Sequence, residues 1–67
     1  MVIVTEVFED EAGRIRERKK LLINFGSWMP ERRWGMDLTK VSIPDDEAIW
    51  VRETSKQIED MFLGVDS

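Results

Sequence analysis

The chain has 67 residues, of which 42% are apolar and 36% charged, and its formal net charge is −4 with no Cys and no His. This length and composition predict one small acidic α+β domain, residues 1–67, whose marginal core favours stabilisation by a partner or by a homodimer contact. The lack of Cys and His excludes disulfides, thiolate or imidazole metal sites, and nucleophilic catalysis that needs these groups.

The N-terminus has no basic region followed by a long apolar stretch, so no signal peptide is predicted. No apolar run in the sequence is long enough to span a bilayer. We therefore expect a cytoplasmic protein with no membrane partner.

The first part of the chain has the pattern of a β-hairpin. Residues 2–8 are rich in β-branched and aromatic side chains, and a turn segment ending at Gly13 follows them. Residues 14–25 then alternate, which predicts a second strand. A helix over residues 9–25 is the alternative, because acids at its start and bases toward its end suit the helix dipole.

Residues 26–35, GSWMPERRWG, contain two glycines, a proline and two tryptophans. This composition predicts an irregular loop that crosses the sheet or its edge. Alternation then resumes, and we expect a third antiparallel strand over about residues 37–43.

The C-terminal part has the pattern of an amphipathic helix over residues 45–63. Pro44 suits a helix start, Asp45 or Asp46 suits its cap, and Gly64 suits its end. Apolar residues recur at spacings of three and four between charged ones. The helix should pack on one face of the antiparallel sheet and give a two-layer α+β fold.

Residues 39–53, TKVSIPDDEAIWVRE, resemble the strand and first helix of a ribbon-helix-helix repressor, in which a short strand ends in Pro-Asp before an amphipathic helix. The second helix of that family has no counterpart here, and a hairpin precedes the segment. The resemblance covers this segment only, and no DNA-binding residue of that family is carried over.

Charge is distributed unevenly along the chain. Residues 14–40 carry eight bases against three acids, whereas the segments on either side are acidic. The simplest interpretation is that these segments neutralise one another in the fold, since opposite charges on neighbouring strands stabilise a sheet. The alternative interpretation is a basic binding face.

We predict that the chain is a small non-enzymatic protein-protein interaction module, such as a phage- or mobile-element-type regulator or inhibitor of a larger protein. Tryptophan and arginine are the residue types enriched at energetic hot spots, and they gather in the expected loop. Trp50 is expected to belong to the core. The predicted partner-binding residues are Trp28, Arg32, Arg33 and Trp34, with Arg14, Arg16 and Arg18 on the adjoining strand.

Binding of single-stranded nucleic acid or RNA is the alternative function. Arg14, Arg16, Arg18 and Lys20 would project from one strand face at roughly 6 to 7 Å intervals, close to the spacing of phosphates. Tryptophans beside them could stack on bases.

We expect no cofactor, metal site or enzymatic activity. The acidic clusters at residues 9–11 and 45–47 lack the pattern of a calcium-binding loop and fit a turn and a helix start. Carboxylates have no second catalytic group placed by a motif, and a domain of this size offers little concavity.

Overall fold

The computed structural model describes residues 2–64, which form a five-stranded antiparallel sheet and one helix. The α+β class predicted from the sequence is therefore confirmed, with two more strands than expected. The elements are β1 (Val2–Glu9), β2 (Ile15–Leu22), β3 (Trp28–Arg33), β4 (Met36–Val41), β5 (Ile49–Val51) and α1 (Ser55–Leu63).

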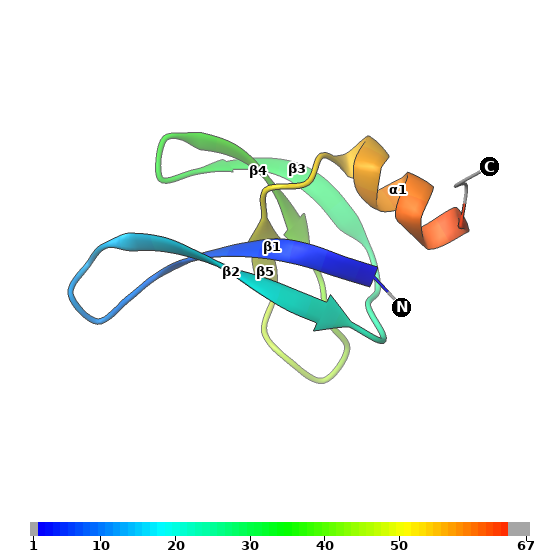
Figure 1. Ribbon diagram of the computed structural model, residues 1–67, viewed down its shortest axis with the longest axis horizontal. Coiled ribbons are helices and arrows are strands. Elements are labelled where there is room, and N and C mark those ends of the chain that lie inside the picture. Colours follow the sequence, from blue (N-terminus) through cyan, green and yellow to red (C-terminus); the bar gives the residue numbers. More distant parts are fainter. Residues whose placement is uncertain (1, 65–67) are drawn as a thin grey trace.

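The strand order is β2-β1-β5-β4-β3. The β1–β2 and β3–β4 hairpins form its two outer parts, and the short β5 pairs with both β1 and β4 and joins them into one sheet. The tight turns of both hairpins lie at one end of the long axis, and α1 lies at the other end (Figure 1). The hairpin turns therefore extend away from the region that the helix covers.

The β1–β2 hairpin confirms the hairpin predicted for residues 2–8 and 14–25, although its second strand ends at Leu22, and the alternative of a helix over residues 9–25 is wrong. Val2 lies opposite Leu22 and Glu9 lies opposite Ile15, so the pairing is continuous over eight residues of each strand. The side chains of the two strands pair in register along this length, which a single helix could not achieve.

The expectation of an irregular loop over residues 26–35 is wrong, because residues 28–33 form the edge strand β3. Pro30 is tolerated there since an edge strand has one side without hydrogen-bonded neighbours. Trp34 and Gly35 form the whole connection to β4. The third strand predicted over residues 37–43 is observed as β4, shifted slightly toward the N-terminus.

The predicted helix of residues 45–63 is present only in its second half. Residues 49–51 form the central strand β5, in which Ile49 and Val51 are buried on one face and Trp50 lies on the other. The spacing of apolar residues in this segment suits a helix. Its β-branched residues nevertheless form a strand, because that conformation buries them between two other strands. The likeness to a ribbon-helix-helix repressor fails for the same reason, since residues 45–53 hold no helix.

The helix begins and ends at clear capping residues. The Thr54 hydroxyl accepts a hydrogen bond from the Gln57 N–H at 3.1 Å, and the Gln57 side chain accepts one from the Thr54 N–H at 2.8 Å. This reciprocal pair satisfies two N–H groups that a helix start leaves free. Gly64 ends the helix in the left-handed conformation, as predicted, whereas the prediction of a cap at Asp45 or Asp46 is wrong.

The core lies between α1 and one face of the sheet, which we call the helix face. Ile58 of α1 is fully buried against it. The buried core cluster consists of Val2, Val4, Leu22, Val41, Ile49, Val51 and Ile58. The other face, which we call the open face, has no helix against it and carries the alternate residues of each strand.

Candidate interaction surface

Trp28 is part of the core, which corrects its predicted place in an exposed loop. Its ring centroid lies 5.6 Å from that of Phe25 and 5.7 Å from that of Phe62. Phe25 and Phe62 meet edge to face at 5.5 Å. These three rings fill the space between β3 and α1 on the helix face, so Trp28 contributes mainly to packing.

Arg32 and Arg33 project to opposite faces of the sheet because they are consecutive residues of β3. The Arg32 guanidinium pairs with the exposed Asp37 carboxylate at 3.3 Å. Arg33 extends over the open face, where its guanidinium carbon lies 4.5 Å from the ring centroid of Trp34 and 3.8 Å from that of Trp50. The two arginines therefore do not share one surface.

Trp34 occupies an unusual position in the chain. It is the first of the two residues that connect β3 to β4, and its φ is +52°, followed by +73° at Gly35. A two-residue hairpin turn of this kind requires positive φ at both residues and favours Asn-Gly or Gly-Gly. The left-handed conformation costs a side chain such as Trp roughly 1–2 kcal/mol.

Four side chains meet on the open face around this turn, and we call them the Trp34 cluster: Glu31, Arg33, Trp34 and Trp50. The rings of Trp34 and Trp50 meet edge to face with centroids 6.3 Å apart. The Trp50 ring N–H donates a hydrogen bond of 2.7 Å to the Glu31 carboxylate. The cluster is thus held in one arrangement by stacking, cation–π contact and hydrogen bonding.

The rings of this cluster are half-buried and leave part of their surface open to solvent. Beneath them, Val7 and Leu38 are 1% and 5% exposed although no helix covers this face. The cluster therefore covers a second small apolar layer and at the same time presents aromatic and cationic surface outward.

Two basic residues of the first hairpin, Arg16 and Arg18, are engaged with acidic neighbours. The Arg16 guanidinium lies 2.7 Å from the Asp10 carboxylate. That of Arg18 lies 2.9 Å from the Glu6 carboxylate and 4.5 Å from the centre of the Phe8 ring. At these positions, neighbouring strands neutralise each other's charge, as the simpler interpretation of the sequence predicted.

The first hairpin turn is organised around Asp10. Its carboxylate accepts hydrogen bonds of 2.9 Å from the N–H groups of Ala12 and Arg14. The Arg14 N–H, and after it the Arg16 guanidinium, hold the pKa of the Asp10 carboxyl below its usual value. Arg14 therefore has a structural role through its backbone, while its side chain is exposed.

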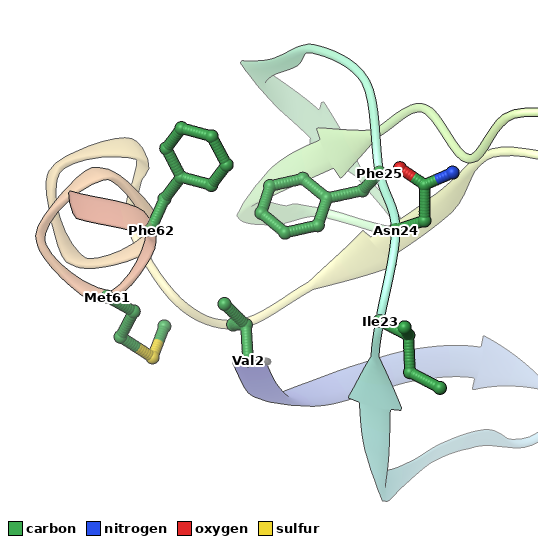
Figure 2. A pocket seen from close by; sticks show the side chains of 6 residues that line it. All are labelled: Val2, Ile23, Asn24, Phe25, Met61 and Phe62. Atoms are coloured by element: carbon green, nitrogen blue, oxygen red, sulfur yellow. The ribbon is translucent and has the colours of Figure 1, made fainter. Parts of the chain in front are cut away.

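A second exposed area lies where β2 leaves the sheet beside the end of α1. Ile23, Phe62 and Leu63 are 83%, 57% and 63% exposed. Figure 2 shows the shallow hollow between these elements, lined by Val2, Ile23, Asn24, Phe25, Met61 and Phe62, with a volume of about 160 Å³. The helical pattern predicts Phe62 in the buried stripe, and this prediction is wrong, because one side of its ring contacts Phe25 and Trp28 while the rest stays exposed at the end of α1.

Sequence reasoning missed the roles of Trp50 and Glu31 in the Trp34 cluster. Two signals were present in the chain. Trp34-Gly35 stands where Asn-Gly would mark a hairpin turn, and Met29, Glu31 and Arg33 alternate with Trp28, Pro30 and Arg32 as in a strand.

No group of side chains among residues 2–64 has the composition of a metal site. Within the same residues, no helix is long and apolar enough to cross a membrane. Comparisons of the chain with protein-family models, curated proteins and solved structures gave no match. Arguments about function therefore depend on the surface itself.

Proposed function

We propose that this protein is a small non-enzymatic module that binds a larger protein, as a regulator or inhibitor, through the Trp34 cluster. The observation that carries this proposal is the position of Trp34 in a turn that favours Asn or Gly. A residue held in a disfavoured backbone conformation is a pointer to function when local stability gives no sufficient reason for it.

The composition and rigidity of the Trp34 cluster support binding of a protein surface. Tryptophan and arginine dominate energetic hot spots, where they fill desolvated pockets on the partner. Here the guanidinium of Arg33 is already stacked on two rings, and Trp50 is already fixed by Glu31. A partner would therefore order few additional rotamers on binding, which lowers the entropic cost of association.

The residues predicted from the sequence contribute unequally to this proposal. Arg33 and Trp34 belong to the proposed surface, and Trp50 joins them. Trp28 packs in the core and Arg32 lies on the other face. Arg14, Arg16 and Arg18 belong to the first hairpin, outside the Trp34 cluster.

The test compares affinity capture by the wild-type chain with capture by a Trp34→Asn variant. Asn suits the positive φ of this position, so the variant removes the ring while keeping the turn. We expect the main partner to be lost from the variant and the purified partner to bind it at least about tenfold more weakly, as for a hot-spot residue.

Leu63→Asn is the matched control, because it also replaces a large exposed apolar side chain but lies at the end of α1. It should bind the partner as the wild type does. Equal affinity of the wild type and Trp34→Asn for the partner would refute the Trp34 cluster as the docking surface.

Nucleic-acid binding by the basic strand is the weaker proposal, because Arg16 and Arg18 are paired with acids. A steep fall of oligonucleotide affinity with salt would support it. Binding of single-stranded oligonucleotides that persists in Trp34→Asn but is lost in a variant with Arg14 and Lys20 replaced by Gln would move the function to the first hairpin.

A further inference from the structure

The two edges of the sheet differ in whether they can accept another strand. Just before β3, the Ser27 carbonyl accepts a hydrogen bond of 2.9 Å from the N–H of Ser42, which directly follows β4. By the alternation of an antiparallel pair, Trp28, Pro30 and Arg32 therefore direct their backbone groups outward. Pro30 has no N–H and lies in the middle of this series, which blunts the edge. The β2 edge contains no proline along its eight residues.

The pairing of β1 with β2 shows which backbone groups of β2 are free. The Asp10 N–H donates to the Arg14 carbonyl at 2.9 Å, which fixes the even-numbered residues as the hydrogen-bonded pairs of this hairpin. The odd-numbered residues of β2 therefore direct N–H and C=O away from β1. No strand among residues 2–64 pairs with this side of β2.

The side chains of these outward-pairing residues form a symmetrical series: apolar Ile15, acidic Glu17, basic Lys19 and apolar Leu21. All four lie on the open face, since they alternate with the residues that face α1. Ile15 and Leu21 are 41% and 48% exposed, and Ile3, opposite Leu21 on β1, is 59% exposed.

We propose that β2 pairs antiparallel with β2 of a second copy and forms a continuous ten-stranded sheet in the dimer. In the register that places the two Arg18 residues at the two-fold axis, Glu17 faces Lys19 of the second copy and Ile15 faces its Leu21. Each contact occurs twice. Opposite charges and apolar pairs facing across strands both stabilise a sheet.

Neighbouring registers lack this complementarity. A shift by two residues in one direction brings Glu17 opposite its own copy, and a shift in the other direction brings Lys19 opposite its own copy. Like charges directly opposite each other destabilise strand pairs. The pattern on β2 therefore specifies both the second copy as occupant and one register.

The helix-face residues of β2 limit the stability of this dimer but do not oppose it strongly. Arg18 would face Arg18 of the second copy, and Arg16 would face its Lys20. Arg16 and Arg18 are already paired with Asp10 and Glu6 of the same chain. The charge of these two arginines at the interface is thus partly neutralised, and the two contacts between Arg16 and Lys20 remain unfavourable.

This inference does not depend on the proposed function, because Glu31, Arg33 and Trp34 lie in the second hairpin, Trp50 lies on the central strand β5, and none of them is on the β2 edge. The Trp34→Asn variant should dimerise as the wild type does. Loss of partner binding and loss of dimerisation are therefore separable results.

The experiment is sedimentation velocity of the full chain over a range of concentrations, with charge-reversal variants. The wild type should form dimers as concentration rises. Glu17→Lys and Lys19→Glu alone should each weaken the dimer about tenfold or more, since each creates two like-charge contacts. An equimolar mixture of these two variants should form heterodimers, because each of the two contacts then again joins one basic and one acidic side chain.

Glu59→Lys and Lys56→Glu make the same changes of net charge on exposed positions of α1 and are the matched controls. They should dimerise as the wild type does. Lys19→Glu leaves the ion pair of Glu17 with Arg52 in place, so it decides the matter if Glu17→Lys does not fold.

A wild type that stays monomeric at every concentration would overturn the proposal. This holds even if the free edge of β2 binds an acidic peptide as an added strand. Dimers that survive both charge reversals, or single variants that fail to recover when mixed, would overturn it as well.

Discussion

The two hairpins of this protein solve the same problem with different residues. In the β1–β2 hairpin, Gly13 takes the positive φ that the turn requires, and Asp10 accepts hydrogen bonds from the turn backbone. In the β3–β4 hairpin, a tryptophan takes the corresponding left-handed conformation ahead of Gly35. The residue in the first turn adopts positive φ without steric cost. The second turn has a tryptophan in a disfavoured backbone conformation, which places its indole ring against Trp50.

The comparison extends to the edges that the hairpins present. Pro30 blunts the edge of the second hairpin, while the edge of the first carries a self-complementary series from Ile15 to Leu21. Each hairpin thus offers a different kind of contact: a rigid aromatic and cationic surface in one, and a strand edge in the other.

The largest expected effect on stability comes from Ile58 of α1, whose side chain packs against strands of both hairpins. Ile58 is fully buried and packs on the core cluster formed by strands of both hairpins. Ile58→Ala should lower the free energy of unfolding by about 2–5 kcal/mol, measured by urea denaturation. Hydrogen exchange on the variant should show both hairpins losing protection together, and selective loss in one hairpin would contradict a shared core.

The next effect tests the cost of a side chain in a left-handed turn. A Cβ added at Gly13 would lie 3.7 Å from Glu9 Oε2, which is ordinary contact, so space is not the obstacle. Gly13→Ala should still destabilise the protein by about 1–2 kcal/mol because φ is positive there. An unchanged thermal midpoint would remove the argument that Trp34 is held at a cost.

A smaller effect concerns pH and the first turn. The pKa of Asp10 is lower in the folded state than in the unfolded state, so its contribution is present above the unfolded pKa and is lost as pH falls through the folded one. An NMR titration should find its carboxyl ionising at lower pH than that of an aspartate in an unfolded peptide. Arg16→Gln should reduce this difference without abolishing it, because the Arg14 N–H bond remains.

An Asp10 midpoint equal to that of an aspartate in an unfolded peptide would mean that the turn is not held through its carboxylate in solution.

The sequence predicted those elements whose pattern had one interpretation. Alternation over residues 14–25 predicted the strand observed as β2, which ends earlier at Leu22, and the glycine at position 64 predicted the end of α1. Residues 49–51 are too few to show the alternation of a strand, so the sequence pattern extends the predicted helix over them. In the structure, pairing with β1 on one side and β4 on the other determines their conformation.

The candidate site was predicted only in part for a related reason. Trp28, Arg32, Arg33 and Trp34 are close in sequence, and in a loop they could share one surface. In a strand, consecutive side chains point to opposite faces, so the set divides between the core and the open face. Trp50 enters the site through strand pairing between distant segments, which local sequence cannot show.

The most direct test of the account is the stability of Trp34→Asn, measured by urea denaturation of the free protein. Asn adopts the left-handed conformation at lower cost than Trp, and this gain should offset the loss of about 1 kcal/mol of aromatic contact. The variant should therefore match or slightly exceed the wild type in free energy of unfolding. That result would show that folding does not need the ring. A loss of about 3 kcal/mol or more would contradict the account, because Trp34 would then be a core residue retained for stability.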